Sequence, residues 1–295
     1  FRFLNPIIYR VYGTFSGFQH LSHMWFWKVR GFMPDRPPQL SCREIQTETT
    51  NDGDVVVINA HCELTRDNSG ILLFPKWLLM KQTITYTFHR KGRRLHVENH
   101  VVPHARLRSL PSLPRVGMSL VLDAPLYNMI YYGRGHVENY SDRKSCAFMG
   151  IHETTARNNH ESYYIVPGEN GNKTDCRWVA FQDKEKCGIC IVSSKNNDNN
   201  NNTKEPFVMN VGASLHSALE LHQADHTCDL DERENGTSPV FATIDYKMMG
   251  VGGDVSWFPA VYPEYLIKAN QEFQYGFWIL PLSGQEDPIE VARTV

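Results

Sequence analysis

The sequence lacks any apolar run approaching the roughly 20 residues that a membrane-spanning helix needs, so we expect no membrane partner. Its opening residues also lack the basic start, apolar centre and small-residue cleavage site of a signal peptide. No initiator Met is present. We therefore expect that the chain begins within a longer protein, or that it has been processed or trimmed.

The sequence also lacks an excess of either charge, since it contains 30 basic and 32 acidic side chains. No run of like charge stands out as a footprint for nucleic acid, so we expect no nucleic-acid partner. The densest basic cluster, H-R-K-G-R-R at residues 89–94, lies between two strand-like stretches. We interpret it as a charged hairpin tip.

Disulfide and metal signatures are weak. Seven cysteines at irregular spacing do not form a disulfide framework, and C-x-x-C at Cys187 and Cys190 lies in a strand-like stretch without a second pair. His216, His222, His226 and Cys228 show no H-x-x-x-H spacing, so the metal interpretation is the weaker one. We predict no metal site and no cofactor in this chain.

Common enzyme motifs are missing as well. No G-x-S-x-G sequence supports a serine hydrolase. The glycine-rich stretch G-V-G-G-D at residues 250–254 is followed by V-S-W-F-P, whose Pro259 opposes the helix that a phosphate-binding loop requires. Nucleotide binding is therefore rejected.

Short strand-like stretches with turn signals are abundant, and 12% of the residues are aromatic. An Asp-Gly turn joins residues 45–49 to 55–58, and a Lys-Gly turn joins residues 82–89 to 95–102, which predicts two hairpins. Further strands are expected at residues 116–122, 129–132, 163–166, 177–181, 188–192, 207–211, 241–248 and 265–280. The pattern predicts an all-β protein: a large antiparallel β-sandwich with one or two short helices, at residues 19–30 and 215–221.

Polar stretches mark the domain organisation. N-N-D-N-N-N-N at residues 196–202 is interpreted as a long hairpin loop. Residues 283–295 are expected to be a polar C-terminal tail that follows a domain of residues 1–282. Four N-x-S/T sequons, at Asn139, Asn172, Asn201 and Asn235, permit glycosylation of a secreted protein.

The polar cluster around Glu138, Asp142 and Arg143, together with Glu169, has two interpretations. These residues either supply paired catalytic carboxylates, which a retaining glycosidase holds about 5–5.5 Å apart, or form an internal network of ion pairs and hydrogen bonds that fixes a loop. We favour the structural interpretation.

Trp257 follows the glycine-rich stretch and also has two interpretations. A loop tryptophan is either a core plug or an exposed platform for the apolar face of a sugar ring. Composition alone favours the core plug.

Three blocks in a fixed order resemble a known family. They are Y-G-R-G-H-V-E-N-Y-S-D-R at residues 132–143, Y-Y-I-V-P-G-E-N-G at 163–171 and I-D-Y-K-M-M-G-V-G-G-D-V-S-W at 244–257. Together they resemble the carboxy-terminal, or small-chain, domain of lactose-type β-galactosidases of glycoside hydrolase family 2. The resemblance covers residues 113–282.

The resemblance implies a galactose-mutarotase-like supersandwich packed beside a catalytic barrel domain or large subunit. It places Trp257 at the family's substrate platform, as a substrate-binding residue for a galactoside sugar, and it assigns Glu138, Asp142, Arg143 and Glu169 to architecture. The nucleophile, the acid/base and the expected magnesium and sodium belong to the barrel, so no catalytic residue is predicted here.

Two positions depart from the family pattern. Residues 6–13 stand where an acidic, amide-rich P-x-D-N-D-x-G loop is usual, and the usual double Asp is reduced to Asp254-Val255. The sequence therefore predicts a non-catalytic part of a β-galactosidase that shapes the active-site mouth. The alternative is a free-standing carbohydrate-binding or scaffold module without hydrolytic activity.

Overall fold

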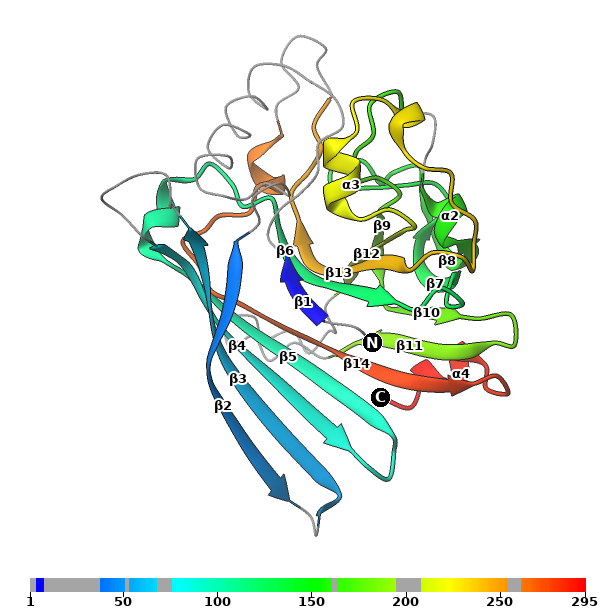
Figure 1. Ribbon diagram of the computed structural model, residues 1–295, viewed down its shortest axis with the longest axis horizontal. Helices are drawn as coiled ribbons and strands as arrows, with labels where there is room; N and C mark the ends of the chain where they lie inside the picture. The colour runs from blue at the N-terminus through cyan, green and yellow to red at the C-terminus, as the bar shows by residue number, and fades with distance from the viewer. Residues whose placement is uncertain are drawn as a thin grey trace.

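Two antiparallel sheets face each other in the computed structural model, which confirms the expected all-β sandwich (Figure 1). The structure describes residues 4–7, 38–50, 53–67, 76–160, 164–194, 208–253 and 261–295. The expected helix at residues 19–30, the polar loop at 196–202 and Trp257 lie outside the described residues.

The larger sheet has nine strands in the order β2-β3-β4-β5-β14-β11-β10-β7-β8. Its strands are β2 (Gln39–Thr50), β3 (Val55–Asp67), β4 (Lys76–His89), β5 (Arg94–Pro103), β14 (Phe273–Ser283), β11 (Cys187–Ser193), β10 (Trp178–Gln182), β7 (Asn128–Gly135) and β8 (Phe148–Thr155).

The smaller sheet has five strands in the order β1-β6-β13-β12-β9. Its strands are β1 (Leu4–Ile7), β6 (Arg115–Leu122), β13 (Val240–Met248), β12 (Met209–Ser214) and β9 (Lys173–Cys176).

Successive side chains of a strand point to opposite faces of the sheet, and this alternation produces two apolar clusters. In β14, Phe277 and Ile279 join the core between the two sheets, whereas Leu280 and Leu282 belong to a smaller cluster on the outer face of the larger sheet. Both faces of this central strand are therefore buried. In Figure 1 the β2–β5 strands extend beyond the smaller sheet, and β2 is exposed along nearly its whole length.

Both predicted hairpins are confirmed. Gly53 supplies the positive φ of the first turn, at 86°, as the Asp-Gly pair predicts. In the second turn the positive φ falls on Arg93, at 46°, and not on Gly92.

Several strand predictions need correction. Residues 164–166 are not a strand, because their polar groups are used elsewhere: the Ile165 carbonyl accepts a hydrogen bond from the Thr227 amide at 2.9 Å. The last strand begins only at Phe273, after a 3-10 turn η4 (Pro263–Tyr265) and an isolated bridge between Leu113 and Ile267. Strands β1, β8 and β9 were not predicted.

Short helices flank the sheets. Helix α3 (Ala218–Gln223) overlaps the predicted stretch 215–221 and begins after Ser217, which forms a reciprocal capping box with Glu220. Helix α4 (Pro288–Ala292) lies within the expected polar tail, where Ile289 and Val291 pack against the outer cluster. The division into residues 1–282 and 283–295 stays a prediction.

Candidate functional site

The glycine-rich stretch that leads to Trp257 is held at its base by one carboxylate. Asp142 accepts hydrogen bonds from the backbone amides of Val251, at 3.0 Å, and Gly252, at 2.7 Å. The amide of Gly250 donates to the carbonyl of Tyr265 at 3.1 Å. Charge-assisted bonds of this kind are stronger than neutral ones, so residues 250–252 are fixed to the body of the domain.

Glycine is required at this anchor for steric reasons. A Cβ atom at Gly250 would clash with the Asp142 carboxylate and would displace it from the amides of Val251 and Gly252. Gly252 and Gly253 have φ angles of 65° and 100°, in the left-handed region that favours glycine. The sequence therefore selects glycines here for close backbone approach and a sharp turn, not for a phosphate.

Asp142 is itself placed by a tight turn and by Glu138. The amide of Arg143 donates to the carbonyl of Tyr140 at 2.8 Å, and the Arg143 guanidinium donates to Glu138 Oε1 at 2.5 Å. Glu138 also accepts the Tyr164 hydroxyl and, at 3.0 Å, the Gly171 amide. The three family-like blocks thus meet at this point, since Glu138 joins the first to the second and Asp142 joins the first to the third.

The electrostatics of Glu138 are those of a buried, satisfied anion. Burial alone would raise the pKa of its carboxyl. The hydrogen bonds from Tyr164 and Gly171 and the charge of Arg143 outweigh burial and leave the pKa below its usual value. Glu138 therefore stays ionised and bonded.

A second buried ion-pair network ties Glu169 to the smaller sheet. Arg115, only 2% exposed, donates through Nε to Asp245 at 3.1 Å and also binds Glu169. Burial would lower the pKa of Arg115, but the charges of Asp245 and Glu169 reverse the effect and raise it. Gly117 lies opposite Asp245 and leaves room for its carboxylate.

Glu138, Arg143 and Glu169 form ion pairs, and Asp142 accepts hydrogen bonds from backbone amides. These are the contacts of an internal ion-pair and hydrogen-bond network, the interpretation that the sequence favours for these four residues. Each of the two glutamates is neutralised by an arginine. Sequence reasoning missed the part played by Arg115 and Asp245. The available signal was a charged residue at the start of one largely apolar strand stretch, Arg115, and one inside another, Asp245. Only the strand register brings those two residues together.

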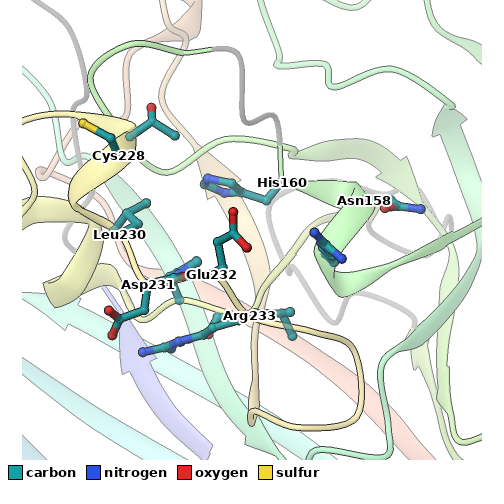
Figure 2. A pocket seen from close by; sticks show the side chains of 11 residues that line it. Asn158, His160, Cys228, Leu230, Asp231, Glu232 and Arg233 are labelled. Atoms are coloured by element: carbon teal, nitrogen blue, oxygen red, sulfur yellow. Dashed lines mark hydrogen bonds between the residues drawn. The ribbon is translucent and has the colours of Figure 1, made fainter.

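The histidine and cysteine cluster is divided by the fold. His216 and Cys228 line a cavity of about 730 Å³ together with His160 (Figure 2). His222 and His226 are not among the residues that line this cavity. Within the described ranges no group of three or more His, Cys, Asp and Glu residues could hold a metal ion.

His160 has an unusual environment in that cavity. Burial, and then the neighbouring His216, lower the pKa of its imidazole to about 4. The two ring centroids lie 6.1 Å apart, and His216 Nε2 lies 3.0 Å from the Asp231 carbonyl. His160 is therefore neutral at physiological pH.

Cys187 and Cys190 both lie in β11, as predicted, with Cys190 in the outer cluster. Burial raises the pKa of the Cys190 thiol to about 12, which makes it a poor nucleophile. Two of the sequons are also structural positions, since Asn139 and Asn172 are buried and their amides bond to backbone groups. A glycan does not fit either side chain in the folded domain.

In the part of the chain that the structure describes, no helix is long and apolar enough to cross a membrane.

The site is a set of buried and partly buried carboxylates that fix loops of a large antiparallel β-sandwich. That sandwich and the three joined blocks define the class of protein. The chain belongs to the family described as Beta galactosidase small chain, which matches residues 19–279.

Similar proteins of known sequence are consistent with this family. A β-galactosidase of Priestia megaterium is 31% identical over 229 residues, which cover 78% of this chain and 19% of that protein. A β-galactosidase of Vibrio cholerae is 31% identical over 278 residues, which cover 92% of this chain and 23% of the relative. The chain thus spans about a fifth of the length of these relatives.

Similar solved structures are more distant. The galactosidase domain of an α-galactosidase-sucrose kinase, AgaSK, aligns with a TM-score of 0.40 and 6% identity over 84% of this chain and 28% of its own. A galactose mutarotase-like protein from Lactobacillus casei gives a TM-score of 0.36 and 9% identity over 81% of this chain and 73% of its own. The strand topology itself, and not these similarities, defines the fold.

Proposed function

We propose that this chain is the non-catalytic part of a β-galactosidase and shapes the mouth of an active site that a separate barrel provides. The barrel, as a domain or a large subunit, would supply the two carboxylates of a retaining hydrolysis of terminal β-galactosides. Any magnesium or sodium would also be held there. This chain would supply Trp257 as a stacking platform for the sugar.

The observation that carries the proposal is the attachment of the glycine-rich stretch to Asp142. A platform that stacks on a sugar needs a fixed position, because a mobile indole would lose conformational entropy on binding. Asp142 supports this by fixing the chain five residues before Trp257, and Glu138 with Arg143 fixes Asp142 in turn. The carboxylates of Asp142 and Glu138 are therefore positioning groups in this proposal.

Family membership and the relatives support the association with a barrel. The relatives named above are β-galactosidases several times longer than this chain. The long exposed edge strand β2, with Ile45 65% exposed, offers surface for such a neighbour.

Substitution of Trp257 tests the platform in the assembled enzyme, formed with a barrel-bearing subunit of the family. Trp257→Ala should raise KM for a chromogenic β-galactoside about tenfold, since one aromatic stacking contact contributes about 1–1.5 kcal/mol. Trp77→Ala, which removes an indole that lies 5.7 Å from the Arg106 guanidinium, is the matched control and should leave KM unchanged.

Unchanged kinetics for Trp257→Ala would contradict the platform role. Sugar binding by the chain without hydrolysis in any mixture would instead establish the alternative, a free-standing carbohydrate-binding or scaffold module.

Asp142 gives a separate prediction for the support of that platform. In Asp142→Ala the amides of Val251 and Gly252 lose a charged acceptor worth about 1.5–3 kcal/mol. Their hydrogen exchange should therefore accelerate at least about tenfold. Exposed Asp225→Ala serves as the control, and equal exchange in both variants would show that Asp142 does not hold the loop.

A further inference from the structure

Two cysteines that are 20 positions apart in the sequence lie directly opposite each other in the sheet. Cys42 of β2 pairs with Cys62 of β3 in the antiparallel register. Opposed residues in such a pair have Cα atoms about 4.5–5.5 Å apart. Disulfides span Cα separations of about 4.4–6.8 Å, so the backbone need not move for a bond to form.

The register also places both side chains on the same side of the sheet, because residues directly opposite each other in an antiparallel pair project to one face. Each thiol also contacts a backbone carbonyl: Cys42 Sγ donates to the Glu44 carbonyl at 3.4 Å, and Cys62 Sγ donates to the Ala60 carbonyl at 3.8 Å. Burial first, and then the neighbouring Cys42 thiol, raise the pKa of the Cys62 thiol to about 11.

The two thiols differ in access. Cys42 is exposed, whereas Cys62 is 6% exposed. Arg43, the extra residue of a β-bulge in β2, separates Cys42 from the regular register that resumes at Glu44. A reagent in solution therefore reaches the thiol of Cys42 before that of Cys62.

No other described cysteine has this arrangement. Cys187 and Cys190 lie three residues apart in one strand, so their side chains leave opposite faces of the sheet. Their cross-strand partners are Ser283 and Leu280. The C-x-x-C of the sequence is therefore not a redox pair, and the cross-strand pair of Cys42 and Cys62 has the geometry that it lacks.

We propose that Cys42 and Cys62 form an oxidation site, at which a low-molecular-weight disulfide such as oxidised glutathione converts the two thiols into a cross-strand disulfide. The Cys42 thiolate attacks the reagent disulfide, forms a mixed disulfide and releases one reagent thiol. Once Cys42 is in the mixed disulfide, its charge no longer raises the pKa of the Cys62 thiol. The Cys62 thiol then loses its proton to water, and the thiolate attacks the Cys42 sulfur and releases the second reagent thiol. Two protein thiols lose two protons and two electrons, and the reagent disulfide is reduced to two thiols.

The product ties the edge strand β2 to its neighbour β3. Among the residues that the structure describes, β2 is exposed at nearly every position and pairs with β3 alone. An edge held on one side is the part of a sheet most prone to local opening. A covalent bond at Cys42 restricts that opening.

Peptide mapping tests the site on the purified chain. After incubation with oxidised glutathione and alkylation of the remaining thiols, a tryptic digest should contain one peptide that links Cys42 to Cys62. Cys62→Ser should stop at the mixed disulfide on Cys42, and in Cys42→Ser the thiol of Cys62 should stay reduced. Cys228→Ser, which removes an exposed cysteine elsewhere, should leave the link intact.

A wild-type chain that stops at the mixed disulfide on Cys42, or that links either residue to another cysteine, would overturn the proposal. The wild-type result does not depend on whether any variant folds. Trypsin cleavage after the exposed Arg43 gives a second measurement, since the rate should fall severalfold on oxidation and recover with dithiothreitol. Equal cleavage rates in both states would overturn the inference that the bond holds the edge strand.

Discussion

Arg115 is almost fully buried between the buried carboxylate of Asp245 and the partly buried carboxylate of Glu169, which makes its substitution costly. Arg115→Met would leave Asp245 and Glu169 without their buried counter-ion, and we expect a loss of about 3–5 kcal/mol in the free energy of unfolding. Chemical denaturation measures the loss.

Arg157→Met is the matched control for Arg115. It removes an ion pair with Glu234 in which both side chains are about half exposed, and it should cost less than about 1 kcal/mol. Similar losses in the free energy of unfolding of both variants would contradict the claim that burial makes the Arg115 ion pairs costly to remove.

His160 should make stability depend on pH. Its folded pKa is about 4, against an ordinary value of about 6.5, so the unfolded chain binds a proton between these values that the folded chain does not. The free energy of unfolding should therefore fall as the pH is lowered from about 6.5 to about 4. This dependence should be weaker in His160→Gln, as denaturation at several pH values would measure.

Exposed His136→Gln is the control for His160 and should keep the pH dependence of the wild-type chain. A wild-type slope that persists in His160→Gln would show that other groups cause it. Ion-paired carboxylates such as Glu138 affect the free energy of unfolding at lower pH. Their pKa values are depressed in the folded chain, so their contribution is lost only as the pH falls below the ordinary pKa of a carboxyl group.

At the scale of the elements, the two hairpin turns provide a matched pair of glycine substitutions. Gly53→Ala should cost about 1 kcal/mol, because its φ of 86° disfavours any side chain. Gly92→Ala should cost much less, since its φ is not in the left-handed region and the nearest atoms belong to the flexible Arg94 side chain. The comparison of the two midpoints in urea tests the turns, and equal costs would contradict the structure.

Local signals explain which elements the sequence predicts. The two hairpins follow from alternation and short turns, and α3 follows from a stretch that Ser217 and Glu220 cap. Strand β8 escaped prediction because it lies at the edge of its sheet, where Phe148 and Ile151 are largely exposed and the pattern is irregular. Helix α4 escaped because its few apolar residues lie among polar ones, yet they meet an outer cluster formed by strands far away in the sequence.

The candidate site likewise has a part that local sequence signals predict and a part that depends on residues far away in the sequence. The blocks around Glu138 and Asp142 were visible in the sequence as polar clusters, and the family resemblance assigned them to architecture. Which atoms each carboxylate binds was not predictable, because the partners Gly171 and Val251 lie 33 and 109 positions away. The pairing of Cys42 with Cys62 likewise depends on a strand register and on the bulge at Arg43.

At the scale of the whole molecule, the chain is a β-sandwich of the β-galactosidase small-chain family that spans about a fifth of its relatives. Its polar clusters among the described residues are bonded to one another and fix loops. This arrangement supports the proposal that the chain positions a surface beside a separate catalytic domain.

Hydrolysis of a chromogenic β-galactoside, measured for the purified chain alone and after addition of a barrel-bearing subunit of the family, tests this account most directly. We predict no hydrolysis by the chain alone and hydrolysis on mixing, above that of the barrel subunit by itself. Hydrolysis by the chain alone would contradict the account, because the carboxylates responsible would then lie within this chain.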